Sequence, residues 1–159
     1  MANMMGLMVL AGPRYSGLVM KRLDPLSPEE RSERMRRVRR QDTKPEMRVR
    51  KLVHGLGYRY RLHDSRLPGK PDLVFTGRKK VIFVHGCYWH RHDCKSGRRL
   101  PKTRLEFWRP KLESNAERDK RNLKQLEEMG WKALVIWECE TNDKEVLAMK
   151  IRQFLGDSS

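Results

Sequence analysis

A run of four apolar residues, Val81 to Val84 (VIFV), constrains the fold of this 159-residue chain more than any other feature. A strand with one solvent-exposed face alternates apolar with polar residues, whereas this run is apolar at every position. Both faces of such a strand must be covered, so the run predicts a central strand in a sheet with helices on each side. The segment Lys132 to Trp137 (KALVIW) is also predicted to be a strand.

Helical and strand patterns alternate along the rest of the chain. A basic helix is predicted from Ser27, where Ser-Pro-Glu-Glu provides an N-terminal cap. The other predicted helices are Thr43–His54, Asn115–Met129 and Asp143–Phe154, and the other predicted strands are Tyr58–Leu62 and Asp72–Thr76. The segment His85–Pro110 has neither period and is predicted to be irregular. Strands between helices indicate an α/β sandwich.

The length of the chain suits one domain with a real core, but not two. We predict this domain over residues 27–156 and a flexible basic arm over residues 1–26, which lack apolar periodicity and contain several glycines and prolines. No basic region precedes the apolar opening MANMMGLMVL, so a signal peptide is not expected. No apolar run approaches the roughly 20 residues that cross a bilayer.

The charge of the chain predicts a polyanionic partner. There are 36 Lys and Arg residues against 20 Asp and Glu residues, which gives a formal net charge of +16. Neutralisation of phosphates by such a surface releases counterions and favours nucleic-acid binding. Charge alone does not distinguish a DNA enzyme from an RNA-binding structural protein.

A cluster of Cys and His residues predicts a structural zinc site. Cys87, His92 and Cys94 have the spacing C-x4-H-x-C, and Cys139 follows a predicted strand further along the chain. Two nearby thiols and an imidazole with a distant fourth ligand can fix an irregular loop to a sheet edge. The alternative is that Cys87 and Cys139 are small core residues and His92 is a surface histidine.

A carboxylate and two histidines fall at neighbouring strand ends. Asp72 opens one predicted strand, while the next strand ends at His85 and is followed by His90. A carboxylate there suits Mg²⁺, and a histidine can accept a proton from an attacking water. Alternatively, Asp72 is a turn residue after Pro71, and the histidines are zinc ligands or satisfied loop residues.

Aromatic residues stand among arginines in the segment predicted to be irregular. They are Tyr88, Trp89 and Trp108, and Arg91 and Arg104 are among the nearby cations predicted to contact DNA. An aromatic wedge can unstack a base step at a cost that is smallest at a mismatch. The alternative for Trp89 is a core residue that packs the Cys/His loop onto the sheet.

Several segments resemble the very-short-patch-repair (Vsr) mismatch endonucleases. These segments are LPGKPDLVF, VIFVHGCYWHRHDC, TRLEFW, NAERDKRN and GWKALVIWEC, in order between about Ser32 and Cys139. The resemblance implies a restriction-endonuclease-like α/β fold, in which helices flank a mixed β-sheet and a zinc-bound loop lies beside the catalytic edge.

The resemblance also implies roles for individual residues. Asp72 would be the magnesium ligand, and Val84 would add its backbone carbonyl at a position where the family often has Thr. His90 matches the general base, His85 a second active-site histidine, and Glu46 a helix glutamate that reaches the site. Glu46 also has a structural explanation, because it is the N3 residue of a predicted capping box.

For the loop, the resemblance agrees with the residue patterns. The members of the Cys/His cluster, Cys87, His92, Cys94 and Cys139, match the family's zinc ligands. Tyr88, Trp89 and Trp108 match aromatic residues that intercalate beside a T·G pair, with Tyr88 in place of the more usual Phe.

The function implied by the resemblance is a strand-specific cut in double-stranded DNA. The chain would nick 5′ of the mispaired thymine at T·G mismatches, which arise by deamination of 5-methylcytosine. It would act as a monomer in the prokaryotic cytoplasm, near the nucleoid, with a functional link to a cytosine-5 DNA methyltransferase. Two alternatives remain: a sequence-specific or structure-specific nuclease of the same fold, or a zinc-containing DNA-binding protein without activity.

Overall fold

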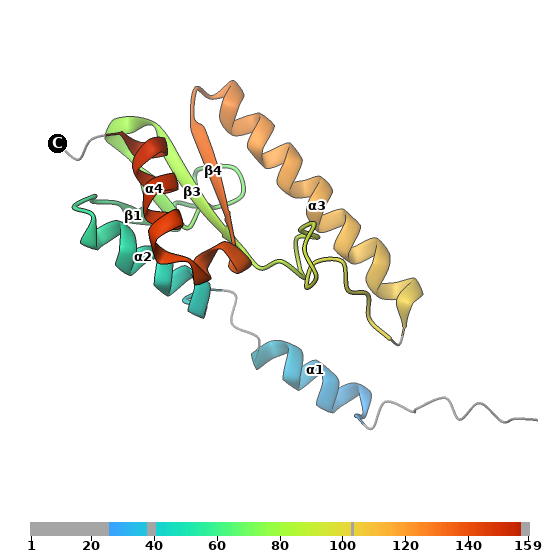
Figure 1. Cartoon of the computed structure of the whole chain (residues 1–159). Helices are drawn as coiled ribbons and strands as arrows, with labels where there is room; N and C mark the ends of the chain where they lie inside the picture. The colour runs from blue at the N-terminus through green and yellow to red at the C-terminus, as the bar shows by residue number, and fades with distance from the viewer. Residues whose placement is uncertain (1–25, 38–40, 103, 157–159) are drawn as a thin grey trace, which may run out of the picture.

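The computed structural model describes residues 26–37, 41–102 and 104–156 (Figure 1). In order, its elements are α1 (Pro28–Arg37), α2 (Lys44–Gly55), β1 (Arg61–Leu62), β2 (Leu73–Phe75), the 3-10 turn η1 (Thr76–Arg78), β3 (Lys80–His85), α3 (Leu105–Glu128), β4 (Lys132–Trp137), the 3-10 turn η2 (Glu138–Asn142) and α4 (Lys144–Leu155). Apart from Leu26, the predicted N-terminal arm lies outside the described residues.

The sheet is mixed, with the strand order β1-β2-β3-β4. The first three strands are antiparallel neighbours, while β3 and β4 run parallel, with Val81 opposite Ala133 and His85 opposite Trp137. In β3, Val81, Ile82 and Phe83 are buried. The prediction of a central, covered strand over VIFV is therefore confirmed.

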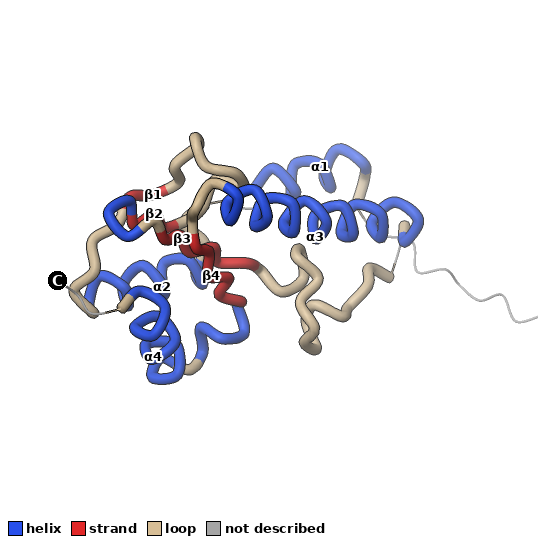
Figure 2. Tube along the Cα trace, turned by 90° about the horizontal axis from the view of Figure 1, so that it is seen from above, coloured by secondary structure: helices blue, strands red, loops and turns tan. Residues whose placement is uncertain are grey.

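Helices cover both faces of the sheet (Figure 2). On one face, α2 and α4 pack on a core that includes Val49, Ile82 and Ile151. On the other face, α3 contributes Leu126 to a second core with Phe83. Neighbouring residues of β3 thus belong to different cores, as expected for a strand covered on both sides.

The predicted N-terminal caps of α1 and α2 form. The backbone N–H of Glu30 donates to Ser27 Oγ at 3.1 Å, and the N–H of Ser27 donates to Glu30 Oε2 at 2.7 Å. At the start of α2, the N–H of Thr43 donates to Glu46 Oε2 at 3.4 Å. These contacts satisfy backbone donors that a helix start leaves without internal partners.

The extent of α3 corrects one prediction. Residues 105–110 were expected to be irregular and Trp108 to lie in a loop, yet α3 begins at Leu105 and contains Pro110. Pro110 is the sixth residue of α3, so its missing N–H removes one internal hydrogen bond, to the carbonyl of Glu106, and the helix continues through it. Arg104 is the N-cap residue of α3, in a left-handed conformation with φ of 52°.

Candidate active site and metal clusters

Asp72 lies immediately before β2, beside the end of β3. Its Oδ2 accepts a hydrogen bond from the backbone N–H of Val84 at 2.7 Å. Because this bond reaches the neighbouring strand, it differs from the local bond of a turn residue. Burial raises the pKa of Asp72 to about 6, and the negative charge of Glu46 adds to this rise, while the Val84 bond and Arg50 oppose it. A bound cation would favour the ionised carboxylate, so the residue suits a divalent metal.

Two histidines meet at the end of β3. His85 is its last residue, and its ring stacks on that of His90 with centroids 3.9 Å apart and planes 11° apart. Burial, together with the charge of the adjacent His90, lowers the pKa of His85 to about 4, so His85 is neutral near pH 7. His90 Nδ1 contacts Asp119 Oδ2 on α3. This contact fixes the ring and leaves Nε2 as its other proton-accepting position.

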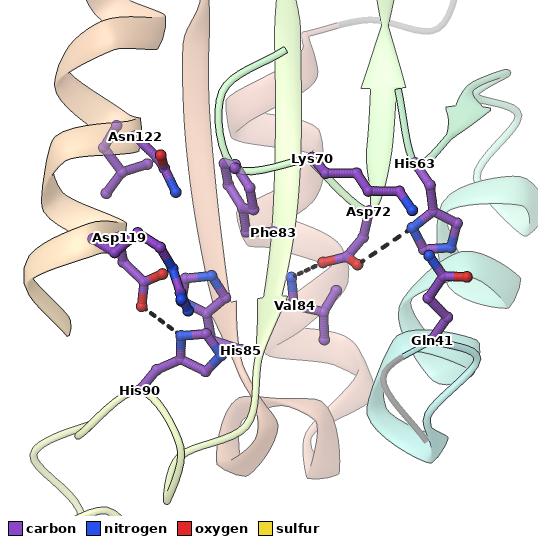
Figure 3. Close-up of a pocket in the computed structure, with 13 residues that line it drawn as sticks. Gln41, His63, Lys70, Asp72, Phe83, Val84, His85, His90, Asp119 and Asn122 are labelled. Atoms are coloured by element: carbon purple, nitrogen blue, oxygen red, sulfur yellow. Dashed lines mark hydrogen bonds and ion pairs between the residues drawn. The ribbon is translucent and has the colours of Figure 1, made fainter. Parts of the chain in front are cut away.

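Asp72 and the histidines line one cavity of about 560 Å³ (Figure 3). The structure therefore brings together Asp72 from the residue before β2, Val84 and His85 from the end of β3, and His90 from the following loop. Other lining residues, which the sequence analysis missed, include Gln41, His63, Lys70, Arg118, Asp119 and Asn122. Asp119 and Asn122 come from α3 and face the histidine side of the cavity, whereas His63 lies beside Asp72.

Glu46 lies behind the wall of this cavity. It is buried, with only 2% of its surface exposed. Its Oε2 accepts the capping bond from Thr43, while Oε1 contacts Arg50 Nη2 and lies 3.2 Å from His63 Nε2. The capping role and the contact toward the site therefore use different oxygens of one carboxylate.

The Cys/His cluster has a geometry that suits zinc. One ligand atom from each of Cys87, His92, Cys94 and Cys139 lies within 4.8 Å of the others. Tetrahedral zinc with Zn–S bonds of about 2.3 Å separates its sulfur ligands by about 3.8 Å. Cys139 is exposed, which excludes the alternative that it is a core residue. The N–H of Gly97 lowers the pKa of Cys94 to about 7, favouring the thiolate that a metal needs.

Close packing of the loop around this cluster requires Gly97. A Cβ atom at this position would lie 2.0 Å from the carbonyl oxygen of His92 and 2.8 Å from that of Cys87. Arg91 Nη1 also holds the loop, since it donates to the carbonyls of Gly97 at 2.7 Å and Arg99 at 3.0 Å. These contacts give Arg91 a structural role in the loop, and its DNA-binding role stays a prediction.

An aromatic row joins this loop to the start of α3. The row consists of Tyr88, Trp89, Trp108 and Phe107, whose successive ring centroids are 5.0, 6.2 and 5.3 Å apart. Phe107, which the sequence analysis missed, is 46% exposed. The guanidinium of Arg104 lies 4.8 Å from the centre of its ring. The other three rings are half-buried. Partly exposed aromatic rings edged by cations are the chemistry that stacks on bases and neutralises phosphates.

Comparisons with known proteins agree on one family. The profile described as "DNA mismatch endonuclease Vsr" matches residues 23–96. The "Type II nicking enzyme V.XorIIP" of Xanthomonas oryzae pv. oryzae is 49% identical over 135 residues, covering 85% of this chain and 98% of that protein. The "DNA mismatch endonuclease Vsr" of Escherichia coli is 44% identical over 117 residues, covering 74% of each chain.

A solved structure supports the same fold class. The homing endonuclease I-Bth0305I catalytic domain superposes with a TM-score of 0.51 at 25% identity, covering 70% of this chain and 93% of that domain. The restriction-endonuclease-like fold expected from the sequence is therefore confirmed. Within the described residues, no helix is both long and apolar enough to cross a membrane.

Proposed function

The chain belongs to the Vsr family of DNA mismatch endonucleases, and from this membership we propose that it nicks one strand of double-stranded DNA 5′ of the mispaired thymine at a T·G mismatch. The observation that carries the proposal is a single cavity lined by Asp72 and by the His90–Asp119 pair. Such a cavity offers a carboxylate for a metal ion and an oriented base for water.

On the metal side, Asp72 would bind magnesium together with the backbone carbonyl of Val84. Magnesium bound there would polarise the scissile phosphate and acidify a water molecule. The N–H of Val84 holds Asp72 Oδ2 at 2.7 Å, so the carboxylate is already oriented at the cavity edge. Glu46 would act on the site indirectly, because it lies behind the cavity wall and contacts Arg50 and His63.

On the histidine side, His90 would take a proton from the attacking water. Its Nδ1 is engaged with Asp119, which leaves Nε2 to accept the proton. Stacking on His85 restricts the plane of the His90 ring, and the low pKa of His85 keeps that neighbour uncharged at neutral pH. His90 is thereby held between a carboxylate and a neutral ring.

Zinc at the Cys/His cluster would be structural. Tyr88, Trp89 and His90 lie in the chain between two of the cluster's members, Cys87 and His92. Fixing those members to Cys139, just beyond β4, would also fix the four residues between them, these three among them. The proposed base and the proposed mismatch reader would thus share one support.

The aromatic row would recognise the mismatch. A wobble pair is easier to unstack than a matched pair, so insertion of Trp89 and Trp108, with Tyr88 beside them, would favour T·G sites. Such sites arise when 5-methylcytosine deaminates, which links the proposed repair reaction to a cytosine-5 DNA methyltransferase. Arg91 and Arg104 would bind DNA near the row.

A nicking assay on matched duplexes tests the proposal. Two end-labelled duplexes that differ only in T·G against C·G are incubated with zinc-loaded protein, with or without added Mg²⁺. We expect a nick 5′ of the mispaired thymine, in Mg²⁺ only, and its loss in Asp72→Asn. Equal nicking of both duplexes would favour a related nuclease of the same fold. Absence of nicking over a range of flanking sequences would favour the non-catalytic alternative.

A further inference from the structure

His63 occupies an unusual backbone position beside Asp72. Its N–H donates to the carbonyl oxygen of Asp72 at 3.4 Å, one step beyond the β1–β2 pair of Leu62 and Leu73. Its φ of 49° is left-handed, a conformation that is uncommon for non-glycine residues. The ladder ends here, and the ring of His63 is directed toward the Asp72 carboxylate (Figure 3).

The contacts of the ring determine where its proton sits. His63 Nε2 lies 2.7 Å from Arg50 Nη2. A guanidinium donates hydrogen bonds, accepts none and keeps its protons in proteins, so Nε2 must be the acceptor. Glu46 Oε1 is further from Nε2, at 3.2 Å, and itself contacts Arg50 Nη2. The ring proton is therefore on Nδ1, which faces Asp72 Oδ1 at 3.8 Å.

Arg50 is held in the orientation that this tautomer needs. Its side chain is only 9% exposed, and Nη1 donates to Asp42 Oδ1 at 2.7 Å while Nη2 contacts Glu46. Asp42, Glu46 and His63 present ligand atoms within 4.8 Å of one another, which alone would suit a metal ion. The guanidinium instead provides the positive charge at this group, so the cluster is better explained as a fixed ion-pair network.

We propose that Arg50 is a positioning residue that selects the Nδ1–H tautomer of His63, and that His63 in turn orients the Asp72 carboxylate for its metal ion. The inference rests on the proposed role of Asp72 as magnesium ligand. Val84 N–H donates to Oδ2 at 2.7 Å, whereas His63 Nδ1 lies 3.8 Å from Oδ1, too far for a hydrogen bond but close enough for its N–H dipole to attract the carboxylate. In the other tautomer, the Nδ1 lone pair would face the carboxylate and repel it. Loss of such support typically weakens metal binding by about 10–100-fold.

The tautomer is tested by ¹⁵N NMR of the histidine rings in full-length, zinc-loaded protein without Mg²⁺. Signals of His63 are assigned by their absence in His63→Gln. We expect a protonated Nδ1 and a bare Nε2 in the wild type, and a shift toward Nε2–H in Arg50→Met, where Glu46 becomes the nearest partner of Nε2. An Nε2–H ring in the wild type, or an unchanged ring in folded Arg50→Met, would overturn the inference.

A second variant covers the case in which Arg50→Met fails to fold. Asp42→Asn weakens the outer anchor of the guanidinium at a side chain that is 61% exposed, so no buried charge is left unpaired. We expect an increased Nε2–H population in this variant as well. An unchanged ring in Asp42→Asn would overturn the inference if Arg50→Met cannot be measured.

The metal step is tested with Mn²⁺, whose free fraction is counted by electron paramagnetic resonance. We expect about 10–100-fold weaker binding in His63→Leu, and partial rescue in His63→Gln, whose amide can both donate and accept. Zinc content and affinity for matched duplex should not change. Wild-type Mn²⁺ affinity in His63→Leu would overturn the inference about His63 and leave the proposed role of Asp72 intact. Unchanged affinity in Asp72→Asn would overturn the proposed magnesium ligand, and with it the metal step.

Discussion

At the scale of single residues, Asp72 places a carboxylate where the metal-free fold disfavours its charge. Its pKa of about 6 lies above the ordinary value of 3.8, mainly because of burial. The folded protein therefore holds this proton to higher pH than the unfolded chain does. The cost in stability is absent below about pH 3.8, grows between the two values, and is complete above about pH 6.

Asp72→Asn should therefore stabilise the Mg²⁺-free protein at pH 7 while abolishing nicking. Relief of the charge contributes at most about 3 kcal/mol, since one pKa unit corresponds to about 1.36 kcal/mol. Urea denaturation of the zinc-loaded protein in buffer without Mg²⁺ measures the difference, which should shrink toward zero near pH 4. Glu113→Gln, at an exposed position of α3, is the control and should show no such pH-dependent gain. A destabilised Asp72→Asn at pH 7 would contradict this account.

Sequence patterns located only part of this constellation. Asp72 could be predicted because it immediately precedes one strand, and His85 and His90 because they end or follow the next strand. The start of the one strand and the end of the other meet at the same edge of the sheet. Asp119 and His63 could not be predicted, because a polar residue on a helix, or one at a frayed strand end, has no local signature of its contacts. Long-range packing brings them to the cavity.

At the scale of elements, the long irregular segment before α3 depends on its Cys/His cluster and on Gly97. Gly97→Ala places a methyl group 2.0 Å from the carbonyl oxygen of His92, so the backbone of the loop must move. We expect less than one zinc per chain and a loss of stability of about 1–3 kcal/mol or more. Metal analysis and thermal denaturation measure both effects.

The chain offers a matched control for Gly97→Ala. At Gly77, an added Cβ would meet nothing within 4 Å, and this glycine has no positive φ. Gly77→Ala should therefore keep full zinc content and wild-type stability. Full zinc content and an unchanged melting temperature in Gly97→Ala would show that the loop is less tightly packed than its geometry indicates.

The uneven burial of α3 along its length explains why this helix was predicted too short. The second half of the helix was predicted from the helical spacing of its apolar residues Leu123, Leu126 and Met129. In the first half, Leu112 is the one buried residue within the described part of the helix. Figure 1 shows that this half extends past the sheet, so no apolar stripe is needed there. β4 was predicted to the residue because its apolar run is packed between helices.

At the scale of the whole molecule, two kinds of DNA contact should separate. The net charge of +16 supplies attraction to phosphates that is independent of sequence and weakens with salt. The aromatic row instead depends on how easily a base step opens. Charge should therefore set the affinity for any duplex, whereas the row should set the preference for a mismatch.

Trp89→Ala tests this separation, because it removes a central ring of the row and leaves every lysine and arginine in place. We expect binding and nicking of the T·G duplex to fall by at least about tenfold, since stacking on an aromatic side chain contributes about 1–3 kcal/mol per base. Affinity for the matched duplex, titrated over a range of salt concentrations, should keep its value and its slope. Tyr88→Phe, which retains the ring, is the control and should behave as the wild type. Equal weakening on both duplexes, together with a lower melting temperature, would instead assign Trp89 to packing between the Cys/His loop and Trp108, 6.2 Å away.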